Sequence, residues 1–190
     1  IFEQQHKVLS KVKISGGGRC NCTNTFADVT DLKQVYPRGA NLLKRLFKQF
    51  GPQDAYRWFE SHGVPLVVQE DQCVFPAAQD SQAIISCFLR EAERHGVQLR
   101  LGTKVGNPES LFPEYDFVAV TIGGTPKGEG CVPSLFTFSI DDPSLTSLMG
   151  TVVEDAMVSI PGTKFRTRGP LLVTHWGMSG PAILKLSSHA

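Results

Sequence analysis

Apolar residues recur at helical spacing in two stretches of the chain. In residues 39–63 the leucines and phenylalanines stand three or four positions apart, which predicts a helix that Gly51-Pro52 interrupts. Residues 81–96 repeat this spacing without a break and predict the most regular helix, with Ser81 as N-cap and Gly96 as C-cap. We also predict a helix over residues 27–37.

Other stretches are patterned as strands. Residues 64–76 alternate around Glu70-Asp71-Gln72 and predict a hairpin, and residues 97–105 predict a further strand. Residues 115–124 are largely apolar, which is typical of a strand buried on both faces of a sheet that helices cover. Ile1-Phe2 resembles the end of another buried strand, with Glu3 at its carboxyl end.

The pattern changes after Gly128. Residues 134–140 and 155–175 alternate without helical period and carry Gly and Pro at turns, which predicts an antiparallel β region. A short helix with Pro181 in its first turn follows. We therefore expect two domains, residues 1–127 with helices and a hairpin, and residues 128–190 rich in β-structure.

Composition narrows the classes of function. The 190 residues carry 19 basic and 18 acidic side chains, a formal net charge of +1, and no basic tract stands out. Nucleic-acid binding through bulk charge is therefore not expected. No apolar run approaches the roughly 20 residues of a membrane span, so we expect neither a membrane partner nor a membrane location.

The five cysteines are odd in number and irregularly spaced, which favours a reducing cytoplasm over a disulfide framework. Cys20 and Cys22 alone form a close pair. A zinc site at this pair is an alternative, but such a site needs a second cysteine or histidine pair at a set interval. We see none in the sequence and predict no bound metal.

The stretch KVKISGGGRCNCTN, residues 11–24, is the most informative candidate site. Three consecutive glycines allow another group to approach the backbone closely, and successive N–H groups can form a nest for anionic oxygens. Arg19 supplies a charge that pairs with phosphate, while Asn21 and Asn24 can donate or accept around a ring. No Lys-Ser or Lys-Thr follows, which excludes a Walker loop. We predict a ligand loop with a bare backbone at residues 16–18; a flexible turn is the alternative.

Two predicted strand ends also carry candidate residues. Glu3 could accept hydrogen bonds from both hydroxyls of a ribose, as in dinucleotide folds, or could be a solvated strand end. Thr121-Ile122-Gly123-Gly124 ends the strand predicted over residues 115–124. A chain takes this form where it crosses beneath a cofactor at the carboxyl edge of a parallel sheet, and a tight turn is the alternative.

The segment VTHWGMSGPAIL, residues 173–184, contains the best candidate for a general base, His175, because imidazole titrates near neutral pH. Ser179 lacks the second spacer of the G-x-S-x-G nucleophile motif. We therefore expect Ser179 to cap the following helix rather than to act as a nucleophile.

Four segments together resemble a known family. In order along the chain they are FEQQHKVLSKVKISGGGRCNCTN, WFESHGVPLVVQEDQCVFP, FVAVTIGGTP and LLVTHWGMSGPAIL. They resemble the bacterial NAD(P)/FAD-dependent oxidoreductases of the aminoacetone-oxidase-like group, and the resemblance spans almost the whole chain. It implies an α/β fold: an FAD-binding, doubly wound Rossmann-like domain, incomplete here, with an inserted β-rich, barrel-like second domain.

The resemblance also implies cofactor contacts. Glu3 would hold the adenosine ribose, and Val105 would touch the adenine through its backbone. Thr121, Gly123 and Gly124 would pass by the ADP half. The pyrophosphate and flavin side would be lined by Lys11, Gly17, Gly18, Arg19, Cys20, Asn21 and Asn24.

The function that the resemblance implies is hydride transfer. FAD would shuttle hydride between a reduced nicotinamide, or a small substrate such as an amine or enone, and an acceptor such as oxygen, with NAD(P)H as the candidate donor. A non-catalytic binding or scaffold module that keeps the fold is the alternative. Family members carry a glycine-rich turn before the position of Glu3 and a segment beyond the last helix, so we expect the sequence to belong to a longer chain.

Overall fold

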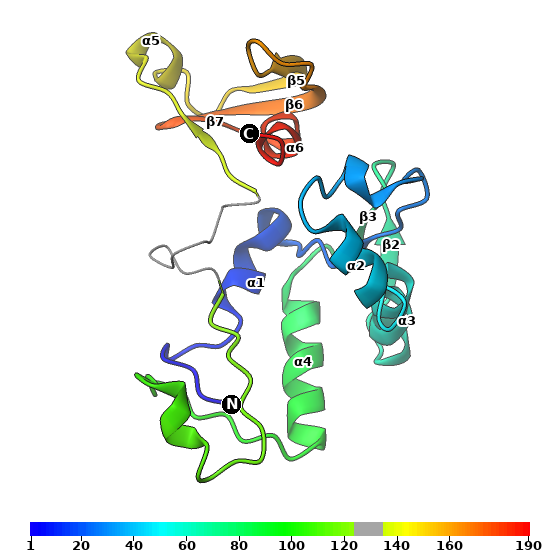
Figure 1. Cartoon of the computed structure of the whole chain (residues 1–190), viewed down its shortest axis with the longest axis vertical. Coiled ribbons are helices and arrows are strands. Elements are labelled where there is room, and N and C mark those ends of the chain that lie inside the picture. The colour runs from blue at the N-terminus through cyan, green and yellow to red at the C-terminus, as the bar shows by residue number, and fades with distance from the viewer. Residues whose placement is uncertain (124–134) are drawn as a thin grey trace. The chain divides into compact units, whose positions relative to one another are not determined.

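The structure, a computed structural model, describes residues 1–123 and 135–190 (Figure 1). The described chain forms two compact units. Ile1–Asp28 and Leu46–Gly123 make up the first, and Val29–Arg45 with residues 135–190 make up the second. The boundary predicted between residues 127 and 128 lies outside the described residues and stays a prediction. The grouping of Val29–Arg45 with the second unit was not anticipated.

The first unit places helices around a small antiparallel sheet of order β1-β3-β2. Thr23 of β1 pairs with Val74 of β3, and Leu66 of β2 pairs with Pro76 of β3. The elements are α1 (Ser10–Ile14), η1 (Ser15–Gly18), β1 (Thr23–Asn24), α3 (Pro52–Ser61), β2 (Leu66–Val68), β3 (Cys73–Pro76), α4 (Gln82–Arg94) and η3 (Pro108–Leu111).

The local predictions for this unit are largely confirmed. The helix predicted over residues 39–63 is divided as expected into α2 (Ala40–Leu46), most of which belongs to the second unit, and α3, which begins at Pro52 directly after Gly51. The backbone N–H of Gly51 donates to Oδ2 of Asp54 at 2.8 Å, which closes the start of α3. His95 is the C-cap of α4, and Gly96, predicted as the C-cap, follows it with φ +66°, a conformation that favours glycine.

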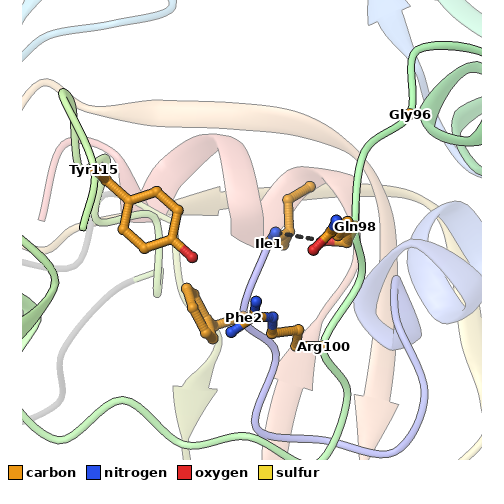
Figure 2. A pocket seen from close by; sticks show the side chains of 6 residues that line it. All are labelled: Ile1, Phe2, Gly96, Gln98, Arg100 and Tyr115. Carbon is orange, nitrogen blue, oxygen red and sulfur yellow. Dashed lines mark hydrogen bonds between the residues drawn. The ribbon is translucent and has the colours of Figure 1, made fainter.

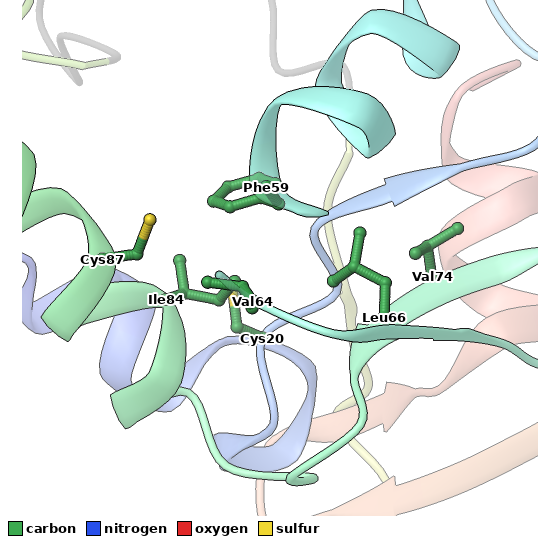
Figure 3. Close-up of a cluster of buried hydrophobic side chains, with 7 residues drawn as sticks. All are labelled: Cys20, Phe59, Val64, Leu66, Val74, Ile84 and Cys87. Atoms are coloured by element: carbon green, nitrogen blue, oxygen red, sulfur yellow. The ribbon is translucent and has the colours of Figure 1, made fainter. Parts of the chain in front are cut away.

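The core of the first unit lies between α3, α4 and the hairpin. Figure 3 shows that the side chains of this cluster come from elements far apart in the sequence. Ile84 on α4 is 1% exposed, and Cys87 one turn later is fully buried. The complete cluster is Cys20, Phe59, Val64, Leu66, Val74, Ile84 and Cys87.

Three predicted elements differ in the structure. Residues 27–37 form only the short 3-10 turn η2 (Leu32–Gln34), because the Asp31 side chain accepts a hydrogen bond from the Lys33 N–H at 3.0 Å and competes with a longer helix. Residues 97–105 pair at a single parallel bridge between Arg100 and Phe2. The chain then turns at Gly102, where φ is +65°.

The strand predicted over residues 115–124 is also absent over its described part, and Gly124 lies outside the described residues. Phe117 is 94% exposed and Ile122 is 75% exposed. A strand that is apolar on both faces needs neighbouring strands and covering helices to order it. Within residues 1–123 and 135–190, no strand pairs with this segment.

The second unit is a four-stranded antiparallel sheet of order β4-β7-β6-β5, with α6 packed against β6. Leu171, Val173 and Ile183 form its buried core, and the Thr167 hydroxyl donates to the carbonyl of Ala182 at 2.7 Å. The β-rich prediction for this region is thus confirmed. The elements are β4 (Phe138–Ser139), α5 (Pro143–Thr146), β5 (Val152–Ser159), β6 (Arg166–Thr174), β7 (Gly177–Ser179) and α6 (Pro181–Ser187), with η2 and most of α2 in the same unit.

The start of α6 corrects one expectation. Pro181 is at the first turn as predicted, but the N-cap is Gly180, with φ +96° and no capping side chain. Ser179 belongs to β7 and does not cap the helix. The backbone conformation at Gly180 determines the start of the helix in place of a serine hydroxyl.

Candidate functional site

The glycine turn, Ser15–Gly18, is fixed to the start of α4. The backbone N–H of Ser81 donates to the carbonyl of Gly18 at 2.8 Å, and its hydroxyl donates to the carbonyl of Lys13 at 2.9 Å. Ser81 is fully buried. It stands at the N-cap position, as predicted, but its hydroxyl binds α1, while Asp80 accepts from the N–H of Gln82 at 2.9 Å. The turn is therefore held in place by α4.

The three glycines differ in what surrounds them. All three have left-handed φ angles, +56° at Gly16, +68° at Gly17 and +85° at Gly18. A Cβ at Gly16 would lie 2.8 Å from the backbone nitrogen of Asn21 and 2.9 Å from Cε1 of Phe75. Apart from its chain neighbours, no residue would lie within 4 Å of a Cβ at Gly17, and the carbonyl oxygen of Lys13 would lie 3.9 Å from a Cβ at Gly18. The expected bare backbone is found at Gly17 and Gly18 but not at Gly16, where Phe75 fills the space.

Arg19 lies directly after this open backbone. Its guanidinium carbon lies 4.2 Å from the centroid of the Phe75 ring. Its Nε donates to the carbonyl of Gly16 at 3.3 Å, and its Nη1 donates to Oε1 of Gln79 at 3.2 Å. The sequence analysis did not anticipate Phe75 or Gln79, because no local pattern connects the end of the hairpin with the glycine turn.

The side chain of Cys20, unlike that of Arg19, points into the protein core. Its φ of +63° directs the side chain into the core, where it is 7% exposed among Val64 and Ile84 (Figure 3). This corrects the expectation for Cys20 in one respect, since only its backbone remains available to a ligand on the glycine turn.

The two asparagines contact the hairpin. Asn21 is exposed and lies near Cys73. Asn24 donates from Nδ2 to the carbonyl of Asp71 at 3.4 Å, and its Oδ1 accepts from the N–H of Phe26 at 2.8 Å. Asn24 thus ties β1 to the hairpin turn, and Asn21 is the asparagine closer to the open glycines in sequence.

Burial raises the pKa of the Cys22 thiol from 9.0 to about 12, and the neighbouring Cys20 adds to this shift. Cys22 in the native protein should therefore react with iodoacetamide at pH 7.5 much more slowly than in denaturant, since the thiolate is the reactive form. Mass spectrometry of timed samples measures this, with the denatured protein as control. Equal alkylation rates in the native and denatured protein would contradict the buried thiol.

The raised pKa of Cys22 also makes the stability of the fold depend on pH. Because the pKa is higher in the folded state, the contribution of the Cys22 thiol to folding stability is fully present below pH 9 and is lost as the pH rises towards 12.

Glu3 and Val105 lie on two adjacent segments. The N–H of Glu3 donates to the carbonyl of Arg100 at 3.0 Å, and the N–H of Thr103 donates to the carbonyl of Glu3 at 2.9 Å. One carboxylate oxygen of Glu3 accepts from the N–H of Gln5 at 2.7 Å. Val105 is half-buried two residues beyond Thr103. Glu3 directly follows Phe2, which forms an isolated parallel bridge with Arg100. The buried strand predicted to end at Phe2 is not found: none of the described strands includes Ile1 or Phe2, and Ile1 is 67% exposed.

Lys11 and Gly123 come together although they are far apart in the sequence. The Nζ of Lys11 lies 3.5 Å from the position that a Cβ on Gly123 would occupy. Thr121 is exposed two residues earlier. The side chain of Lys11 in α1 thus lies beside the end of the segment Thr121–Gly123. Gly124, the next residue, lies outside the described residues.

A hollow of about 360 Å³ lies beside the parallel bridge (Figure 2). Phe2 and Tyr115 pack edge to face there, with centroids 6.1 Å apart, and the Arg100 guanidinium lies 5.3 Å from the Phe2 centroid. The hollow includes none of the predicted cofactor residues, although Phe2 directly precedes Glu3. Its lining is Ile1, Phe2, Gly96, Gln98, Arg100 and Tyr115.

His175 lies in the second unit, at the exposed turn between β6 and β7. Its ring packs edge to face on Trp176, with centroids 4.3 Å apart. Within the part of the chain that the structure describes, no residue hydrogen-bonds to the His175 ring. No described group is therefore placed to orient this imidazole as a base. The same residues contain no cluster of three or more His, Cys, Asp or Glu side chains suited to a metal ion.

Comparisons with known proteins identify the family. The HI0933-like protein Rossmann domain matches residues 1–115, and the HI0933-like protein barrel and H2TH domain matches residues 132–190. The first match alone covers more than half of the chain, so the chain belongs to the HI0933-like family. Its fold class is accordingly a Rossmann-type α/β domain with a β-rich, barrel-type second domain, as expected from the sequence.

Three similar proteins align with the whole of this chain. A ribosomal RNA dihydrouridine synthase of Escherichia coli is 26% identical, and one of Haemophilus influenzae is 23% identical. A 3-dehydro-bile acid delta(4,6)-reductase of Clostridium scindens is 22% identical. The chain spans about half the length of each, namely 54%, 55% and 53% in the same order. None of the helices that the structure describes combines the length and apolar character of a membrane span.

Proposed function

We propose that the chain is the partial nucleotide-binding portion of an FAD-dependent oxidoreductase. The observation that carries this proposal is the open backbone at Gly17 and Gly18, directly before Arg19, in a chain that belongs to a Rossmann-domain family. A backbone without side chains beside a cationic guanidinium suits a diphosphate. When bound, FAD supplies the hydride chemistry, and the protein supplies position and electrostatics.

The described residues fit this cofactor in three places. Arg19 and the exposed Asn21 lie beside the open glycines, where the pyrophosphate and flavin side is proposed. Lys11, which the resemblance assigns to the pyrophosphate and flavin side, adds a second cation next to Gly123, which it assigns to the ADP half. Glu3 stands at the end of a parallel pairing, the position from which a carboxylate binds a ribose in dinucleotide folds. Gly124 and its surroundings stay a prediction.

We propose a carbon–carbon double bond conjugated to a carbonyl as the substrate group, which is the enone class. The names of two relatives, dihydrouridine synthase and delta(4,6)-reductase, both denote reduction of carbon–carbon double bonds. The uracil ring and a 3-dehydro steroid with a delta-4 bond each place that double bond next to a carbonyl. Hydride addition to such a bond is favourable because the carbonyl takes up the developing negative charge.

Several narrower assignments belong to the same proposal. NAD(P)H is the proposed electron donor, and a small molecule is the proposed substrate, in keeping with a formal net charge of +1. Ribosomal RNA is a second candidate substrate, favoured by the names of two relatives. Amine oxidation, as in aminoacetone-oxidase-like flavoproteins, is the remaining alternative, and product analysis with an enone, a uridine-containing RNA and an amine distinguishes the three.

The proposal predicts that Arg19→Ala weakens FAD binding by about tenfold to a hundredfold, because a charged hydrogen bond to phosphate contributes about 1.5–3 kcal/mol. Quenching of flavin fluorescence during titration measures the dissociation constant. Arg57→Ala is the matched control, since among the described residues that exposed guanidinium pairs only with Asp54, at 2.6 Å. A protein that takes up no FAD would contradict the proposed function, and equal losses in both variants would contradict the role of Arg19.

A further inference from the structure

The Arg19 guanidinium is held by three groups, and all three are uncharged. They are the carbonyl of Gly16 at 3.3 Å, the side-chain oxygen of Gln79 at 3.2 Å and the face of the Phe75 ring at 4.2 Å. Of the described residues, none provides a hydrogen-bond acceptor for Nη2. Arg19 therefore has a defined orientation, while no carboxylate in residues 1–123 or 135–190 compensates its positive charge.

The neighbouring cation is in a different situation. Lys13 donates to Oδ1 of Asp80 at 3.2 Å, so a carboxylate already balances its charge. The N–H of Gln82 and then Lys13 hold the pKa of Asp80 below its usual range, which keeps that carboxylate ionised. Of these two cations, only Arg19 is both oriented and uncompensated.

The amide of Gln79 is itself oriented. Its Nε2 donates to the carbonyl of Pro76 at 3.1 Å, which leaves Oε1 to accept from Arg19. Gln79 has a left-handed φ of +52°, a conformation that residues other than glycine seldom adopt. The turn after β3 thus presents an amide oxygen, and not a carboxylate, to the guanidinium.

We propose that Gln79 is a positioning residue for a phosphate-binding Arg19. Its neutral oxygen and the Phe75 ring orient the guanidinium without neutralising it, so that Nη2 is presented to a diphosphate. An arginine fixed before binding loses less conformational freedom when the ligand arrives. The inference rests on the proposed function, because it takes FAD as the owner of the diphosphate.

The test compares two variants of Gln79 in the full chain. Both Gln79→Ala and Gln79→Glu remove the hydrogen bond to Pro76, but Gln79→Glu gives Arg19 a charged partner. We expect Gln79→Ala to raise the FAD dissociation constant by about threefold and Gln79→Glu by about thirtyfold, because the carboxylate both neutralises Arg19 and repels phosphate. A purely structural role would give the opposite order, since glutamate offers Arg19 the stronger bond. Phe75 is not varied because it is buried and belongs to β3.

Two controls complete the experiment. Gln82→Glu places the same charge at the start of α4, where the native side chain contacts Ser86 and not Arg19, and should change FAD affinity by less than about twofold. In an Arg19→Ala background, Gln79→Ala should cause no further loss, because the group that it positions is gone. Additive losses, or equal effects of Gln79→Ala and Gln79→Glu, would overturn the inference.

Titration with inorganic pyrophosphate separates this inference from the proposed function. Arg19-dependent binding of pyrophosphate that weakens in Gln79→Glu, in a protein that takes up no FAD, would support the inference and contradict the flavoprotein assignment. FAD binding of equal strength in all variants would support the flavoprotein assignment and contradict the inference about Gln79.

Discussion

Replacing Gly16 by alanine should destabilise the first unit by about 3 kcal/mol, whereas the same change at Gly17 should cost about 1 kcal/mol. Both positions have left-handed φ angles, +56° and +68°, so the backbone strain is similar. The difference lies in the space around them. A Cβ at Gly16 would meet the backbone of Asn21 at 2.8 Å and the Phe75 ring at 2.9 Å, and a Cβ at Gly17 would meet nothing within 4 Å.

Urea unfolding, followed by tryptophan fluorescence from Trp58 in the first unit, measures the two free energies. Gly17→Ala is the internal control, because it introduces the same methyl group on the same turn. The pair also bears on cofactor binding, since a methyl group at Gly17 would point into the open space proposed for the diphosphate and should weaken FAD binding more than it weakens folding. Equal destabilisation by the two variants would show that Phe75 does not close the space beside Gly16.

Ile84→Ala should destabilise the first unit by about 3 kcal/mol, within the usual cost of deleting a buried aliphatic side chain and leaving a cavity. Ile84 is 1% exposed and lies in the cluster that joins α4 to Cys20 and Val64. Because Ser81 at the start of the same helix holds the glycine turn, FAD affinity should fall together with stability.

Ile14→Ala is the matched control for this change. It deletes the same atoms from α1 of the same unit, but Ile14 is 75% exposed, and the expected cost is below about 0.5 kcal/mol. The midpoint of urea unfolding is the measurement for both variants. A loss at Ile84 as small as that at Ile14 would mean that α4 is not packed as described.

The elements that sequence reasoning predicted well are those whose signals are local. The helix α4, the hairpin of β2 and β3, and the break at Gly51-Pro52 each depend on residues within one or two turns. Residues 115–124 could not be predicted in this way, because an apolar strand is ordered by partners that its own pattern does not specify. The Rossmann-type fold class was predicted from the order of the family motifs, and the match to the HI0933-like Rossmann domain supports it. The described strands themselves do not indicate it, because they pair antiparallel and the one parallel pairing within the described residues is the bridge at Phe2.

The candidate site was predictable only in part, for a related reason. The glycines and Arg19 are adjacent in sequence, and their composition alone indicated a ligand loop. Gln79, which orients Arg19, is 60 residues further along the chain. The family resemblance placed Cys20 on the ligand side, but with a left-handed φ its side chain lies in the core. Backbone conformation at one residue thus decides what composition cannot.

The exposed segment Phe117–Ile122 has a consequence for handling the protein. The six residues FVAVTI carry no charge, no glycine and no proline, and most of them favour strands. Short segments of this kind, when uncovered, pair with copies of themselves into cross-β assemblies. In concentrated solution, this stretch rather than the charged helix α4 is therefore where chains would first join and precipitate.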